Sequence, residues 1–162
     1  MLNGLINYIP AIKYGNLVDN AELNPAISQS ATVAITSAQL LALATTPITL
    51  ITTTASGTAI ILDSMVFEMN PTSTTYTVAG AENIVIQYNN STTTGSIMSA
   101  VIPQSVITSG SAGYYYLTAT NVAGGLVVVP NTGITLGVTG NLNPTVGTGT
   151  AKVILNYYIV TL

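Results

Sequence analysis

The chain has 162 residues, of which 48% are hydrophobic and only 4% are charged, and it contains no Cys, His or Trp. Its two lysines and five acidic residues give a net charge of -3, so it lacks the cationic surface that binds nucleic acid. Without thiols and imidazoles, the thiol nucleophile, the usual general base and the commonest zinc ligand are all missing. We therefore expect one domain that is not an enzyme and holds no metal or cofactor.

The distribution of apolar residues argues against a membrane partner. No uninterrupted apolar run reaches the roughly 18 residues that a membrane-spanning helix requires. The first residues, Met1 to Gly4, lack the basic start of a signal peptide, so we expect no export by that route. Because charges are so few, the 26 Thr, 12 Ser and 14 Asn residues must keep the surface hydrated.

Residues 1–30 are expected to form an extended N-terminal arm. Their apolar residues follow no sustained period of 2 or 3.6, and Pro10 and Pro25 discourage a long helix. The main apolar groups are Leu5, Tyr8, Ile9, Ile12, Tyr14 and Leu17. Such groups cannot form a core by themselves, so they need another surface. That surface is either a second protein or, alternatively, a sheet edge of the chain's own domain.

Residues 31–162 are expected to form one all-β domain. Short segments rich in β-branched and aromatic residues are separated by Gly, Pro, Asn, Ser and Thr, which favour turns. We expect strands near residues 31–36, 47–53, 58–69, 75–79, 83–89, 96–102, 114–119, 125–129, 133–138 and 150–161. Short strands at intervals of about 8–12 residues are typical of a two-sheet β-sandwich or jelly roll.

One short helix interrupts this pattern near residues 37–44. Thr36 or Ser37 can cap its start, and Gln39 lies three residues after Thr36, as in a capping box. Three leucines supply an apolar face before a proline prevents continuation. The helix is expected to close one end of the sandwich, because a ligand site built on it would have few polar groups to use.

The strand near residues 58–69 is apolar on both faces. Strict alternation places six side chains on one face, namely Ala59, Ile61, Asp63, Met65, Phe67 and Met69. Two apolar faces indicate a central strand or a face covered by another subunit, so we expect an oligomer. The same alternation puts Asp63 and Glu68 on opposite faces, which excludes a glycosidase-type carboxylate pair unless a bulge intervenes.

Three consecutive tyrosines suggest a binding surface. In a strand, Tyr114 and Tyr116 lie on one face and Tyr115 on the other. An exposed tyrosine combines an apolar ring with a polar tip, so it can stack on a sugar or fill a protein interface. Two interpretations stay open: core packing with subunit contact, or contact with a glycan.

Three stretches of the chain are distinctive: ITSAQLLALATTPITLI at 35–51, AIILDSMVFEM at 59–69 and KVILNYYIV at 152–160. They resemble small virion proteins of tailed bacteriophages, namely head decoration, cement and head-fibre proteins. The resemblance covers residues 33–161. It implies a non-enzymatic structural protein, commonly a homotrimer, that is assembled in the bacterial host cytoplasm and attached to the capsid exterior.

Two functions are consistent with these observations. The leading one is decoration and cementing of a phage capsid, with the arm contacting the major capsid protein and the domain contacting further copies of itself. The alternative is a receptor-binding or glycan-binding module of a head fibre or tail, which would use the tyrosines at 114–116. Neither function has nucleic acid or a membrane as a partner.

Overall fold

The described part of the chain forms two antiparallel sheets that pack face to face. The computed structural model describes residues 28–52, 54–79, 83–88, 97, 101–119, 129–139 and 142–162. Its strands are β1 (Gln29–Ile35), β2 (Ile48–Ile51), β3 (Thr58–Asn70), β4 (Thr77–Ala79), β5 (Asn83–Tyr88), β6 (Ile102–Pro103), β7 (Gly113–Thr118), β8 (Ile134–Val138), β9 (Asn143–Thr145) and β10 (Thr150–Thr161). Its helices are α3 (Ser37–Leu41) and α4 (Ser105–Thr108).

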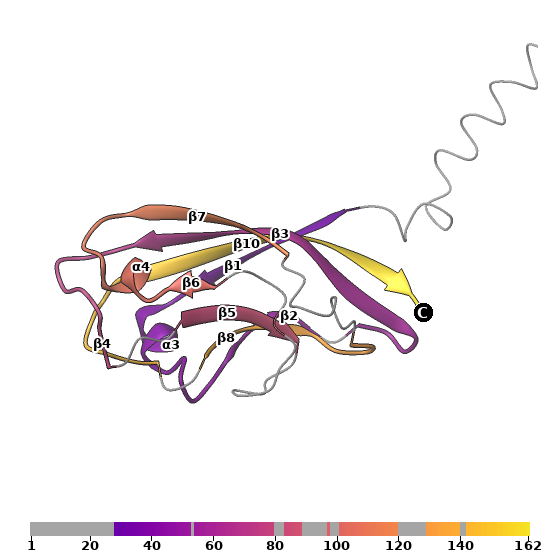
Figure 1. The fold of residues 1–162 in the computed structure, drawn as a ribbon, viewed down its shortest axis with the longest axis horizontal. Helices are drawn as coiled ribbons and strands as arrows, with labels where there is room; N and C mark the ends of the chain where they lie inside the picture. Colours follow the sequence, from indigo (N-terminus) through magenta and orange to yellow (C-terminus); the bar gives the residue numbers. More distant parts are fainter. Residues whose placement is uncertain are drawn as a thin grey trace, which may run out of the picture.

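The strands are arranged in two layers of four. The first sheet has the order β1-β10-β3-β7, the second has the order β2-β8-β5-β6, and β4 pairs separately with β9. All these pairings are antiparallel. Figure 1 shows the two layers, with α3 and α4 toward the end of the sandwich opposite the C-terminus. The prediction of an all-β sandwich with a short helix is therefore confirmed.

Hydrophobic side chains from both sheets fill the space between the layers. The residues at the centre of this core are Met65, Phe67, Met69, Val153 and Leu155 from the first sheet and Ile84, Ile86, Ile134, Leu136 and Val138 from the second, and none is more than 2% exposed. They alternate along their strands because side chains of a strand point to opposite faces in turn. Burial of apolar surface, at roughly 25 cal/mol per Å², is the main force that holds the sheets together.

A β-bulge at Asp63 corrects the expected faces of β3. Asn156 of β10 pairs with Ser64, but the next residue, Tyr157, pairs with Leu62, so Asp63 has no partner across the ladder. The extra residue reverses the alternation, so Ile60 and Leu62 join the core face and Asp63 is exposed. Regular alternation would have placed the Asp63 carboxylate in the core, where an unpaired charge is costly.

The short helix begins where the sequence indicates. Thr36 is the N-cap, its hydroxyl accepts a hydrogen bond from the Gln39 amide, and the Gln39 side chain accepts one from the Thr36 amide at 2.9 Å. The helix itself ends at Leu41, earlier than expected, and turns continue to Thr45. Leu40 and Leu43 are fully buried, so this segment closes part of the core.

Some expected segments fall on residues that the structure does not describe. These include residues 1–27 of the arm expected at 1–30, whose last two residues, Gln29 and Ser30, instead lie in β1. They also include the strand expected at 125–129, apart from Val129. Of the strand expected at 96–102, the structure shows Ile102 in β6 and an isolated bridge between Ile97 and Gln87. Conversely, β9 and α4 were not expected, because β9 has the sequence Asn-Pro-Thr and α4 is four residues long.

Candidate functional site on the outer face of the first sheet

The face of the first sheet that points away from the core is a grid of side chains, which we call the outer face. Each row of the grid takes one residue from each strand in the order β1, β10, β3, β7. The rows are Ala34, Lys152, Glu68, Tyr114; then Thr32, Ile154, Val66, Tyr116; then Ser30, Asn156, Ser64, Thr118. The first two rows end in exposed tyrosines, and the third is polar throughout.

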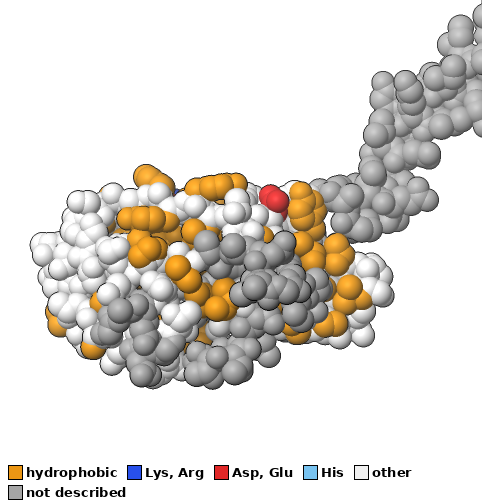
Figure 2. All heavy atoms as spheres, in the orientation of Figure 1, with side chains coloured by type: hydrophobic (Ala, Val, Ile, Leu, Met, Phe, Trp, Pro, Cys, Tyr) orange, Lys and Arg blue, Asp and Glu red, His pale blue; other side chains and the backbone are white. Residues whose placement is uncertain are grey.

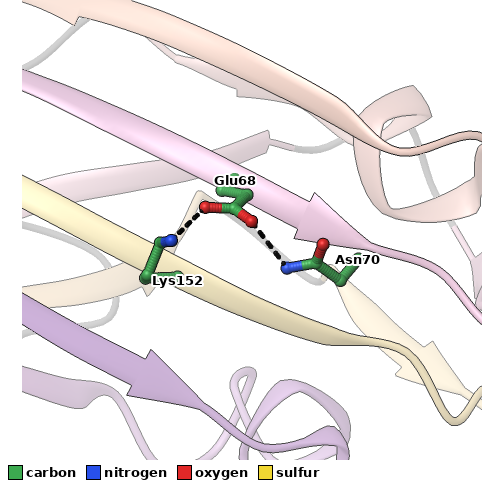
Figure 3. Close-up of polar contacts among 3 residues, drawn as sticks. All are labelled: Glu68, Asn70 and Lys152. Atoms are coloured by element: carbon green, nitrogen blue, oxygen red, sulfur yellow. Dashed lines mark hydrogen bonds and ion pairs between the residues drawn. The ribbon is translucent and has the colours of Figure 1, made fainter.

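A charged pair lies at the centre of the first row. The ammonium of Lys152 contacts Oε2 of Glu68, and Nδ2 of Asn70 donates a hydrogen bond to Oε1 of Glu68 at 3.1 Å. Figure 3 shows the carboxylate of Glu68 between its two partners. The pair joins β10 to β3, so two neighbouring strands hold these groups in place.

Both charges are stabilised by this arrangement. The pKa of Glu68 is lowered, first by the hydrogen bond from Lys152 and then by the one from Asn70. The pKa of Lys152 is raised, chiefly by its hydrogen bond to Glu68 and to a smaller extent by the negative charge of Glu68 and by the nearby phenol of Tyr114. The carboxylate and the ammonium are therefore both ionised at neutral pH.

The tyrosines at 114–116 are divided between the two faces of β7, as expected from the sequence. The side chains of Tyr114 and Tyr116 are 74% and 67% exposed on the outer face. Tyr115 points the other way and packs against the core. The core-packing interpretation therefore holds for Tyr115 alone, and the other two rings are free to contact a partner.

The polar third row is also ordered by a side-chain contact. Nδ2 of Asn156 donates a hydrogen bond to Oγ of Ser64 at 3.2 Å. Both residues belong to the central strands of the sheet, and Ser64 is almost fully buried. The outer face thus has a polar end near the bulge and an aromatic edge along β7.

A hollow lies beside α3, but its walls carry few groups that could bind or react with a ligand. Its volume is about 370 Å³, and its walls come from β1, α3 and the segment that leads into β2, including Val33, Ala38 and Pro47. No ionisable side chain lines it. The described residues also contain no group of three or more His, Cys, Asp or Glu side chains that could hold a metal ion.

Sequence reasoning found the tyrosines of the outer face but not the whole face. The sequence places Glu68 on one face of its strand, but it does not indicate that Lys152 or Asn70 lies beside it. No local signal joins these residues, because they meet only when β10 pairs with β3 and β3 pairs with β7. The expected arm contacts, Leu5, Tyr8, Ile9, Ile12, Tyr14 and Leu17, lie outside the described residues.

The surface of the sandwich carries few charges. Figure 2 shows hydrophobic side chains in separate patches on a surface that is otherwise mostly uncharged. Among the described residues, the large apolar side chains with the highest exposure outside the outer face are Val101, Val146 and Leu162. Neither described helix is long and apolar enough to cross a membrane.

Comparisons with known proteins place few limits on the function. No family model matches the chain, and no curated protein sequence matches it. Among solved structures, the chain is similar to a chain of the cyanophage Pam1 capsid asymmetric unit, with 18% identity over 82% of this chain and 83% of that chain. The TM-score is 0.40, and a similarity at this level supports no conclusion about function.

Proposed function

We propose that this protein is a non-enzymatic structural component of a bacteriophage virion that binds the outside of the capsid and cements it. The sequence resemblance to head decoration proteins over residues 33–161 supports this function. Cementing works by mass action, because a partner that binds only the assembled shell stabilises the assembled state. On this proposal the protein acts at the capsid exterior after assembly in the bacterial host cytoplasm.

We further propose that the sandwich is a jelly roll. In support, β1 pairs with β10, β2 with β8, β3 with β7 and β5 with β6, so early strands pair with late ones. This is the order in which eight strands are wound into a jelly roll, an architecture common in viral capsid proteins and lectins. The architecture is compatible with the proposed function, although a fold alone does not define one.

The observation that supports attachment through the arm is that the domain has both of its sheets without it. The two four-stranded sheets are built from strands within residues 29–161. None of the eight strands described in these two sheets includes the six apolar residues of the arm, from Leu5 to Leu17. We infer that they bind the major capsid protein as an extended segment, with Tyr8 and Tyr14 as anchors.

Removal of residues 1–27 tests this proposal. Because β1 begins at Gln29, the truncation leaves both sheets intact. We expect the truncated protein to keep its melting temperature within a few degrees and to lose co-sedimentation with capsids that lack the native protein. As matched substitutions in the full chain, Tyr8→Ser with Tyr14→Ser should weaken binding, whereas Lys13→Gln should not.

Two results would contradict the role of the arm. If the truncated protein binds capsids as tightly as the full chain, the attachment surface lies within residues 28–162. If the truncation unfolds the domain, the arm is a strand of its own sandwich. The circular dichroism spectrum of the truncated protein distinguishes these two results.

The proposed assembly is a homotrimer, which would match the threefold positions of a capsid. Light scattering after size exclusion should give about 50 kDa, three times the chain mass of 16.6 kDa. A single species of chain mass at micromolar concentration would contradict the trimer.

A second candidate function, a glycan-binding module of a head fibre or tail, is favoured by one observation. Tyr114 and Tyr116 are both well exposed on one rigid strand. Capsid binding through the arm does not require these rings, so the two functions can belong to one molecule.

A further inference from the structure

We propose that the outer face of the first sheet binds an uncharged hexose polysaccharide. The site, which we call the tyrosine platform, consists of Tyr114, Tyr116, Glu68, Asn70 and Lys152. The two rings stack on the C–H faces of the sugars, and the three polar side chains bond to sugar hydroxyls. This activity is independent of attachment to a capsid through the arm.

The two tyrosine rings are placed side by side on one strand. Tyr114 and Tyr116 are two residues apart on β7, so they lie on the same face, roughly 7 Å apart along the strand. Both are more than two thirds exposed, at 74% and 67%. A tyrosine side chain has few rotatable bonds, so it supplies a large contact area at a low cost in conformational entropy. The two rings thus form a short aromatic track for neighbouring sugar units.

Three polar side chains lie beside the rings. In the register of the sheet, Glu68 is directly opposite Tyr114, and Lys152 is directly opposite Glu68. Lys152 and Asn70 each bond to Glu68, which holds the three side chains in place before any ligand arrives. The ammonium has three donors and the carboxylate about four acceptor sites, so both retain capacity after these contacts. Sugar hydroxyls, which donate and accept, match this mixed set.

The charge of the platform indicates the class of polysaccharide. Lys152 is the only lysine among the residues that the structure describes, and Glu68 already neutralises it. With a chain net charge of -3, the platform has no excess positive charge to attract an acidic polymer. An uncharged hexose polymer has no such requirement.

The exposed aromatic area favours a sugar over a second protein. A tyrosine has about 150–250 Å² of surface, so the exposed parts of the two rings present roughly 300 Å². A stable protein interface buries about 800 Å² on each partner. The remaining outer-face residues beside the rings are half-buried or small and polar, including Val66 and Thr118. The aromatic area therefore suits a ligand of a few sugar units.

Affinity electrophoresis of the full-length protein tests the proposal. The probes are four soluble polymers: the uncharged hydroxyethyl cellulose, mannan and dextran, and the acidic alginate. We expect at least one uncharged polymer to retard the protein and alginate to have no effect. Tyr114→Ala with Tyr116→Ala should weaken binding at least about tenfold, or about 1.4 kcal/mol. Val101→Ala, which removes an exposed apolar side chain elsewhere, should leave binding unchanged.

Three results would overturn the proposal. The first is that no uncharged polymer retards the native protein, or that alginate retards it more strongly than they do. The second is that the double tyrosine variant keeps its affinity while its melting temperature is unchanged. The third is that this variant loses capsid binding or forms a smaller oligomer, because the platform would then be a protein interface. Arm truncation gives a separate result, so failure here does not affect the proposed capsid attachment.

Discussion

Tyr88 is a buried side chain that joins the two sheets directly. It belongs to β5 of the second sheet, is 2% exposed, and donates a hydrogen bond from its hydroxyl to the carbonyl oxygen of Ile60 in β3. Burial raises its pKa to about 12. The reason is that an ionised phenol loses its hydration in the core. Tyr88 therefore contributes both to the packing between the sheets and to the stability of the fold at alkaline pH.

The pH dependence of this residue has a defined sign. The folded protein holds the phenol proton more tightly than the unfolded chain, whose tyrosines have a pKa of 10.0. The stabilisation is complete below pH 10 and is lost as the pH rises toward about 12, by roughly 2–3 kcal/mol in total. We expect urea unfolding of the native protein to show this loss. The loss should be much smaller in Tyr88→Phe, which itself costs about 1 kcal/mol at neutral pH.

The control for this prediction is the Tyr88→Phe variant, whose loss of stability at alkaline pH is compared with that of the native protein. Burial also raises the pKa of Tyr76, and Tyr76 is present in both proteins. Subtraction of the Tyr88→Phe curve from the native curve removes its contribution. Equal alkaline slopes in the two proteins would show that Tyr88 does not contribute to alkaline unfolding.

At the scale of elements, the bulge in β3 determines which side chains enter the core. Asp63 has no partner across the ladder to β10, yet its carbonyl oxygen accepts a hydrogen bond from the Ala119 amide at 3.2 Å. Its carboxylate is exposed. The bulge therefore depends on the presence of an extra residue and not on the Asp63 side chain.

Deletion of Asp63 tests this role. Without the extra residue, the segment from Thr58 to Leu62 must turn Ile60 and Leu62 away from the core or lose its pairing with β10. We expect a loss of more than about 4 kcal/mol in the free energy of unfolding, measured with urea. Asp63→Ala keeps the residue count and should change stability by less than about 0.5 kcal/mol. Similar small effects for both variants would contradict the account.

The start of helix α3, in contrast to the bulge, is determined by residues that are close together in the sequence. Thr36 and Gln39 form a reciprocal capping box three residues apart. Because both partners lie in one turn, the start of the helix follows from the sequence without knowledge of the sheets. The end of the helix at Leu41 depends on more distant residues, because Leu40 and Leu43 are buried in the core between the sheets.

At the scale of the whole molecule, the shortage of charge should make the protein insensitive to salt. The described residues contain one ion pair, between Glu68 and Lys152, and surface pairs of this kind contribute little to stability. At ~1 M salt the Debye length is about 3 Å, so charge interactions are largely screened. We expect capsid binding and stability to be nearly unchanged between low salt and ~1 M salt.

The same composition predicts little dependence on pH between about 6 and 9. The chain has no His and no Cys, and the ordinary pKa values of its other side chains lie outside this range. Capsid co-sedimentation, measured over a series of salt concentrations and over a series of pH values, tests both predictions. A tenfold loss of binding at high salt would indicate that ionic contacts, and not apolar ones, hold the protein on its partner.

Features that depend on neighbouring residues and on composition could be predicted from the sequence. Alternation along the chain indicated the β class, most described strands and the division of the tyrosines on β7. The pair Thr36 and Gln39 located the helix start, and the missing His and Cys restricted the chemistry. These features are local because backbone geometry assigns each side chain a face from its position within a few residues.

Long-range packing of the strands determines which distant residues meet and where the alternation breaks. The row of Lys152, Glu68 and Tyr114 exists because three strands from different parts of the chain pair in one register. The bulge at Asp63 reverses the faces of β3, because one extra residue lets Ile60 and Leu62 enter the core while β3 stays paired with β10. Both results depend on free energies of long-range contacts, which no short window of sequence contains.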